Sequence, residues 1–290
     1  MTTTTPEAAA PTTTGVVETT REVFGPVLEP FRIAGRVSSL AFRALINVPA
    51  ALKYRSVIGN HISDIAVGAG AFIVGAGAVT VIVIMTAVIG IQTSLEGTKG
   101  LELIGAQDLV GFISAYASIR EIAPLMAGVI FASQIGAHFT AELGAMRISD
   151  EIDALEVMGL PSLRYLVSTR LVASMMVVLP LYVIGLYVQL LTTRFTSTVF
   201  FSVVPGVYDQ YFTLYLQRPD VIFSVVKVLV FISLVTFIHA AYGFYASGGP
   251  EGVGHAVGRA VRLSVTLIFV VNFVMSLLFW GGGDTVRFSG

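Results

Sequence analysis

The chain has 290 residues, of which 55% are hydrophobic and only 12% are charged, and its mean hydropathy is +0.84. A soluble domain of this length needs a charged, hydrated surface, so the composition excludes an ordinary soluble protein and predicts that a bilayer surrounds much of the chain. The net charge of −1 argues against a nucleic-acid binder, and the absence of cysteine excludes disulfides and thiolate metal sites.

The N-terminal part of the chain divides into two regions. Residues 1–20 are rich in Thr, Ala and Pro without an apolar run, so we expect a disordered tail and not a signal peptide. Residues 21–60 interleave apolar and basic side chains, which predicts an amphipathic helix in the membrane interface, broken at Pro26, Pro30 and Pro49. A plain soluble linker is the alternative interpretation of this second region.

The membrane domain is expected over residues 61–290. It contains five long apolar segments, each long enough for the roughly 20 residues that a helical crossing needs. They cover about 66–91, 110–145, 165–191, 221–245 and 263–280. The predicted fold is therefore an all-α membrane protein with five transmembrane helices. The aromatic-rich stretch 192–220 suits a membrane–water boundary and is expected to include a half-buried helix.

The distribution of basic residues predicts an orientation. With the N-terminus in the cytoplasm, eleven Lys and Arg residues fall inside and four outside, while Arg120 and Lys227 fall within spans. Because cytoplasmic segments carry the excess of basic residues, we expect a multi-pass protein of the inner (plasma) membrane with its C-terminus outside.

The connection between spans two and three predicts a short cytoplasmic helix. Ser149 is expected to cap its first turn, and Gly159 with Pro161 to end it. Such a helix can pass force from a soluble motor to the membrane, with Glu151 on a face that enters a partner's groove; an ordinary interfacial helix is the alternative. The apolar side is expected to hold Ile148, Ile152, Leu155 and Met158, and the other side Asp150, Asp153 and Glu156.

Two further patterns lie within the spans. Small residues recur every four positions in span two, which predicts close helix packing, at a subunit interface, along a lipid path or inside one subunit. They include Gly128, Ala132, Gly136 and Gly144. Charges are costly in lipid, so Arg120, Glu121 and Lys227 are expected to pair or to face a wet cavity, and the depth of Lys227 is compatible with a contact to Glu121.

Several chemistries have no legible residues in the sequence. We find no phosphate-binding Gly-x-x-x-x-Gly-Lys-Ser/Thr, no His-Glu-x-x-His and no Gly-x-Ser-x-Gly. We therefore expect no enzymatic activity and no bound cofactor in this chain.

The run Glu142 to Gly159 (ELGAMRISDEIDALEVMG) resembles the signature of the MlaE/YrbE permease family, with further similarity at Arg120 to Leu125 and Gly248 to Gly254. The Gly248 to Gly254 element and the Thr-rich start look most like actinobacterial YrbE proteins of Mce lipid import systems. Met146 to Ser149, together with Gly254 to Arg259, resemble the B-type half of the A-type and B-type pairs in those systems. The resemblance places the ATPase-coupling element at Asp150, Glu151, Ile152, Asp153, Ala154, Leu155, Met158 and Gly159.

The resemblance also implies partners. These are a cytoplasmic ABC ATPase dimer that uses ATP and Mg, a second YrbE-type permease subunit, MCE-domain proteins on the outer side and a lipid substrate. The expected function is a permease subunit of an ABC-type lipid transporter. A secondary transporter or a passive lipid channel without ATP is the alternative, and an intramembrane enzyme is a third class for which no residue set is legible.

Overall fold

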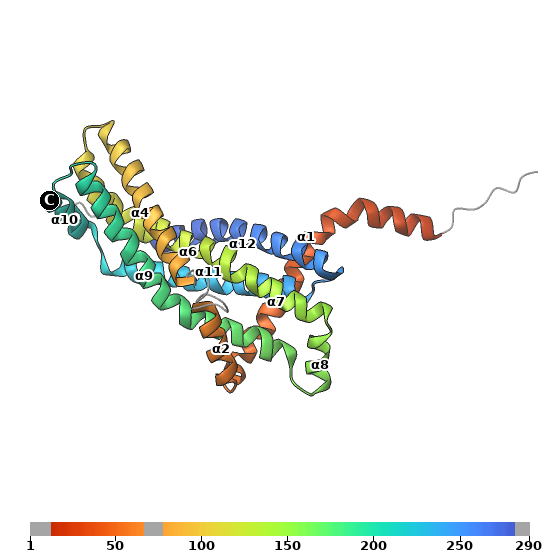
Figure 1. Cartoon of the computed structure of the whole chain (residues 1–290). Coiled ribbons are helices and arrows are strands. Elements are labelled where there is room, and N and C mark those ends of the chain that lie inside the picture. Colours follow the sequence, from red (N-terminus) through yellow and green to blue (C-terminus); the bar gives the residue numbers. More distant parts are fainter. Residues whose placement is uncertain (1–12, 67–77, 282–290) are drawn as a thin grey trace, which may run out of the picture.

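The computed structural model describes residues 13–66 and 78–281, and every regular element within these ranges is a helix (Figure 1). Two short helices, α8 (Glu151–Val157) and α10 (Pro205–Tyr215), lie at opposite ends of the bundle, the α8 end and the α10 end. Five stretches are long and apolar enough to cross a membrane, which confirms the predicted all-α fold. They are Val79–Glu102, Gln107–Ile148, Arg164–Val199, Arg218–Phe244 and Gly249–Trp280.

The region before the spans is a pair of helices. Helix α1 (Thr13–Ala51) begins within the segment expected to be a tail and continues through Pro26 and Pro30, so the predicted breaks there are wrong. A proline inside a helix removes few backbone hydrogen bonds and commonly bends the helix without ending it. Figure 1 shows α1 changing direction along its length. A short turn after α1 leads into α2 (Arg55–Ala66).

The first span is displaced along the chain from its predicted place. Helix α4 runs Ala78–Glu102, and the earlier part of the predicted segment falls on residues 67–77, outside the described residues. The polar residues that follow the predicted end of the span, such as Gln92 and Ser94, continue the helix because their side chains have hydrogen-bond partners. Gln92 Nε2 donates to Glu96 Oε1 at 2.8 Å, and the Ser94 hydroxyl lies 2.7 Å from that of Ser197 in the third span.

The second span is one long helix with two wider, π-helical stretches. It comprises η1 (Gln107–Leu109), α5 (Val110–Ile113), the π segment η2 (Ser114–Ile122), α6 (Ala123–Phe131), the π segment η3 (Ala132–Gly136) and α7 (Ala137–Ile148). A π segment changes the direction in which the following side chains point, and such segments are frequent at functional sites.

The remaining spans follow α8. The π segment η4 (Arg164–Ser168) leads into α9 (Thr169–Val199), which passes through Pro180 without interruption. Helix α10 occupies the boundary region, before α11 (Arg218–Phe244) and α12 (Gly249–Trp280). Gly248 and Gly249 have φ of 89° and 69°, a conformation that favours glycine, so the Gly-Gly-Pro run forms the turn that starts α12.

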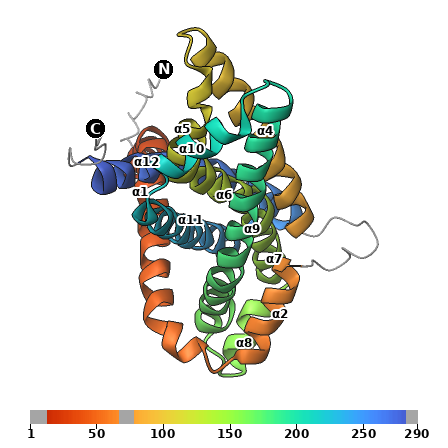
Figure 2. The ribbon, with the colours of Figure 1, turned by 90° about the vertical axis from the view of Figure 1, so that its left-hand side faces the viewer.

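Helix α11 lies in the middle of the bundle, against α6, α7, α9 and α12 (Figures 1 and 2). Half of its most apolar stretch is buried inside the chain. The corresponding share is 22% for α4 and 17% for α12, so these two helices present most of their apolar surface outward. Lipid or another protein must cover that surface, because exposing so much apolar surface to water is unfavourable.

Candidate functional site

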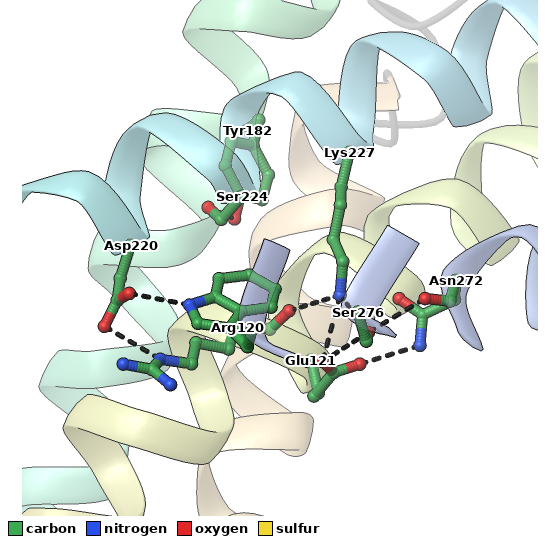
Figure 3. Close-up of polar contacts among 9 residues, drawn as sticks. Arg120, Glu121, Tyr182, Asp220, Ser224, Lys227, Asn272 and Ser276 are labelled. Atoms are coloured by element: carbon green, nitrogen blue, oxygen red, sulfur yellow. Dashed lines mark hydrogen bonds and ion pairs between the residues drawn. The ribbon is translucent and has the colours of Figure 1, made fainter. Parts of the chain in front are cut away.

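A cluster of charged side chains lies between the second span, α11 and α12, toward the α10 end (Figure 3). Its first ion pair joins Arg120 Nε to Asp220 Oδ2 at 2.8 Å, and both residues are 2% exposed. Trp280 Nε1 donates to the other oxygen of Asp220 at 3.0 Å, and the Arg120 guanidinium lies over the Tyr116 ring at 3.9 Å. A buried pair holds together only when further hydrogen bonds offset the loss of water, and Trp280 supplies one of them.

The second ion pair joins Lys227 and Glu121, which the sequence placed within reach of each other. Lys227 is fully buried, and its Nζ donates to Glu121 Oε1 at 3.0 Å, to the Arg120 carbonyl at 2.8 Å and to Ser276 Oγ at 2.7 Å. An ammonium group has three donors, so each proton of Lys227 has an acceptor. Lys227 is thereby fastened to both neighbouring helices, the second span and α12.

Glu121 is the accessible member of the cluster, with a side chain 40% exposed. Its carboxylate accepts from Asn272 Nδ2 at 2.7 Å and from Ser276 Oγ at 2.6 Å (Figure 3). Asn272 Oδ1 is buried and has no partner among the described residues. Two cations and two anions balance, so the cluster is electrically neutral while one acceptor on its α12 side remains unused.

The helix geometry explains how two consecutive residues serve different pairs. Arg120 and Glu121 both lie in the π segment η2. Arg120 reaches the start of α11, while Glu121 reaches Lys227 further along α11 and the C-terminal part of α12. Sequence reasoning found Arg120, Glu121 and Lys227 because they are charges inside apolar segments. It missed Asp220, which falls at a predicted span boundary, and Asn272, Ser276 and Trp280, which are ordinary residues for a membrane helix.

The short helix at the α8 end is present, but its cap differs from the prediction. Ser149 ends α7, and its hydroxyl donates back to the Ala145 carbonyl at 3.0 Å; the residue before α8 is Asp150, with φ of 58° and no capping hydrogen bond from its side chain. A serine hydroxyl can either cap the N–H groups of the next helix or donate to a carbonyl of the preceding turn, and the sequence pattern does not reveal which it does. The Ser149 cap prediction is therefore wrong.

The predicted apolar side of α8 divides between the interior and the surface. Ile152 is 1% exposed and Leu155 is half-buried, and both pack on the chain's own core. Val157 and Met158 are 89% and 67% exposed. The surface offered to a partner is thus an apolar tip beside acids. The other candidate coupling residues, Asp150, Glu151, Asp153, Ala154 and Gly159, are also exposed.

The small residues of the second span pack within the chain. A Cβ on Gly128 would lie 3.2 Å from Phe231, one on Gly136 would lie 2.7 Å from the His239 ring, and one on Gly144 would lie 2.7 Å from Val253. Ala132 is fully buried in the same packing. These small residues therefore let α11 and α12 approach the second span closely. Of the three roles considered for them, this is helix packing inside one subunit.

At the α10 end, Arg194 of α9 holds α10 through a two-point contact with Asp209, at 2.7 and 2.8 Å. Hydrogen bonds and charge from Arg194 lower the pKa of Asp209, so this carboxyl stays ionised at neutral pH. Burial raises the pKa of Tyr208 on the inner side of α10 to about 12. Among the described residues no group of three or more His, Asp or Glu side chains is placed to hold a metal ion.

These features together define a class: a multi-pass α-helical membrane protein with a neutral charged cluster in its interior and a short exposed helix at one end. The sequence profile described as "Permease MlaE" matches residues 67–278, most of the chain. The chain therefore belongs to the MlaE permease family.

Curated relatives agree with this assignment. The chain is 28% identical over 213 residues to a probable ABC transporter permease protein of Synechocystis, covering 73% of this chain and 81% of the relative. It is 28% identical over 216 residues to a probable ABC transporter permease protein of Rickettsia bellii, covering 71% and 80%. It is 26% identical over 214 residues to Protein TRIGALACTOSYLDIACYLGLYCEROL 1, chloroplastic, of Arabidopsis thaliana, covering 73% of this chain and 61% of that longer protein.

Proposed function

We propose that the chain is the permease subunit of an ABC-type transporter that moves lipids or other hydrophobic substrates across the inner membrane, driven by a separate ATPase. Membership of the MlaE permease family supports this, as do relatives named ABC transporter permeases and one relative named after a galactolipid. Import, and an Mce system of the actinobacterial YrbE type, rest on the sequence resemblance.

The observation that carries ATP coupling is the build of α8. Ile152 anchors this helix in the core, so a push on the exposed tip at Val157 and Met158 is transmitted to α7 and α9, the spans that α8 connects. An ABC ATPase dimer docked at this end fits that build. A secondary transporter or passive channel has no need of such a contact, and this is the competing function.

The experiment is co-purification of the tagged chain with an ATPase subunit, comparing Met158→Asp with Glu156→Asp as a matched control that keeps its charge. A new charge at an apolar contact should reduce the recovered ATPase about tenfold or more, because the aspartate is desolvated without a partner. Recovery of no ATPase with the unaltered chain would favour the competing function. Recovery unchanged by Met158→Asp would move the docking site away from α8.

The outward surfaces of α4 and α12 support a second permease subunit, since each buries little inside this chain. We place the lipid chamber between two such subunits, with the second span's cluster beside it, and an MCE-domain assembly at the α10 end. Native mass spectrometry of the extracted complex measures the number and kind of permease subunits. A single permease in a complex that still transports lipid would refute this arrangement.

The proposed orientation places the N-terminus and α8 in the cytoplasm and the C-terminus outside. Asp153 and Leu103 are exposed at the α8 and α10 ends respectively, and the native chain has no cysteine to interfere with labelling. We expect an impermeant thiol reagent to label Leu103→Cys but not Asp153→Cys in intact cells. Labelling of Asp153→Cys alone would invert the orientation.

A further inference from the structure

Helix α1 is fastened to η4, the π segment that follows α8 after a short loop. Figure 2 shows the orange part of α1 running to the end of the bundle at which α8 lies. There Arg164 Nε of η4 donates to Asn47 Oδ1 of α1 at 3.2 Å. The Asn47 amide donates in turn to the Arg43 carbonyl at 2.7 Å, which leaves its oxygen facing η4. The Ser168 hydroxyl of η4 donates to the Ala44 carbonyl of α1 at 2.9 Å.

These contacts allow only one position of η4 on α1. Ser168 and Ala44 are both fully buried, and a buried hydroxyl that lost its acceptor would destabilise the fold. Tyr165 of η4 also meets Tyr54, in the turn after α1, edge to face with 5.4 Å between the ring centroids. Aromatic pairs favour this geometry. The chain before the first span therefore holds η4 through two hydrogen bonds and one ring contact.

The same part of α1 shares an apolar core with α8. Leu40 of α1 and Ile152 of α8 are each 1% exposed, and both belong to one cluster of buried side chains that includes Ala44. Leu166 and Val167 of η4 belong to the same cluster. Helix α8 therefore stands on a core that α1 helps to build.

Helix α8 depends on this core for its position. It has only seven residues, and no side chain caps its first turn. Isolated helices shorter than roughly 12–15 residues are marginal in water, so packing and not intrinsic helicity fixes α8 in place. A push on its exposed tip moves the spans only if the core beneath it stays rigid, because a core that yields absorbs the push.

We propose that α1 braces the coupling element, with Asn47 and Ser168 as positioning residues that hold η4 while the ATPase pushes on α8. This inference rests on the proposed function in that an ATPase must act on α8. The brace itself needs no ATPase, so the two proposals can fail separately.

The outward side of α1 suits this role. Phe42, Leu45 and Ile46 are 67%, 49% and 63% exposed, and the basic side chain of Arg43 lies among them. A helix with such an apolar stripe and basic neighbours lies in the interface plane of a membrane. With one side in the interface and the other on η4, α1 gives α8 a fixed point against which force can act.

The first measurement is hydrogen exchange of the α8 amides, read by mass spectrometry on the purified full chain in lipid nanodiscs. Ser168→Ala removes the donor to Ala44, and Asn47→Leu removes the acceptor of Arg164. Each change should speed exchange in α8 about fivefold, because one hydrogen bond that opposes local opening is lost. Exchange in α12 should not change.

Two matched variants serve as controls. Asn47→Asp keeps an acceptor for Arg164 and should leave exchange in α8 near that of the unaltered chain. Ser39→Ala removes an exposed hydroxyl that donates to the Arg36 carbonyl within α1, and it should change nothing. The inference would be overturned by unchanged exchange in Ser168→Ala and Asn47→Leu, by equal acceleration in Ser39→Ala, or by Asn47→Asp behaving as Asn47→Leu does.

The second measurement distinguishes a brace from a contact that only stabilises the fold. It compares exchange in the complex with its ATPase, without nucleotide and with ADP and vanadate. In the unaltered complex the trapped nucleotide should change exchange in both α8 and α10. In Asn47→Leu with Ser168→Ala the ATPase should be recovered in equal amount and α8 should still respond, while the response of α10 falls about fivefold or more.

An α10 response that is equal in this double variant and the unaltered complex would overturn the inference, and so would an unaltered complex in which α10 does not respond. Recovery of no ATPase with the unaltered chain would count against the proposed function alone. Exchange of α8 in the permease by itself would then still test the brace.

Discussion

Replacing Lys227 with methionine removes the cation that links the second span to α11 and α12. Breaking a buried ion pair by deleting one partner costs about 3–5 kcal/mol, because the other charge is left buried. Glu121 is 40% exposed and keeps its bonds from Asn272 and Ser276, so the lower end, about 3 kcal/mol, applies here. Glu121→Gln should cost about 1–2 kcal/mol, since Lys227 retains the Arg120 carbonyl and Ser276 as acceptors.

The double variant Lys227→Met with Glu121→Gln removes both charges and should be no worse than Lys227→Met alone. The two single losses together then exceed the double loss by about 1.5 kcal/mol, a coupling energy within the range measured for contacting residues. Val230→Met, on an outward-facing and 39% exposed position of α11, is a control for the methionine itself.

Unfolding by denaturing detergent can be followed through Trp280, the only tryptophan of the chain, whose ring lies 4.8 Å from Lys227 Nζ. Its fluorescence therefore reports on the cluster directly. Single losses that add to the double loss within about 0.5 kcal/mol would refute the reasoning, because they would show that Lys227 and Glu121 act independently.

Gly136→Leu should lower the free energy of unfolding by about 1–3 kcal/mol, because the new side chain overpacks against the His239 ring. A thermal midpoint equal to that of the unaltered chain would contradict this packing. Burial, then the charge of Arg170, lowers the pKa of His61 to about 4, below its unfolded value of 6.5. The unfolded chain therefore binds a proton that the native chain refuses, so His61 stabilises fully above pH 6.5 and loses that contribution as pH falls toward 4. Thermal midpoints at pH 7 and pH 5 should fall with acidification, and less in His61→Asn; an equal fall in both would exclude His61 as a cause.

The spans and the charged positions could be predicted from the sequence because hydropathy and charge are properties of single residues in a window. The partners of those charges could not. Arg120 and Asp220 are 100 positions apart, and Asp220 lies where hydropathy alone assigns a boundary. The two π segments of the second span also escape prediction, although the first of them holds both Arg120 and Glu121.

The short helix shows a different limit. Its position and its termination at Gly159 follow from local preferences, and the structure agrees with φ of 77° at that glycine. Which of its apolar residues face a partner depends on how the helix lies on the bundle. Ile152 and Leu155 are used internally and Met158 is not, although all three have the same spacing and chemistry.

The cluster also sets an order for the making of the protein. Arg120 and Glu121 emerge from the ribosome about a hundred residues before Asp220 and Lys227. At the usual 5–20 residues per second, that interval is about 5–20 s. For that time the second span carries two charges without their partners, and charges at membrane depth are costly. Both charges of the second span therefore have to wait for α11 before their ion pairs can form, so the pairing of this cluster is among the late steps of folding.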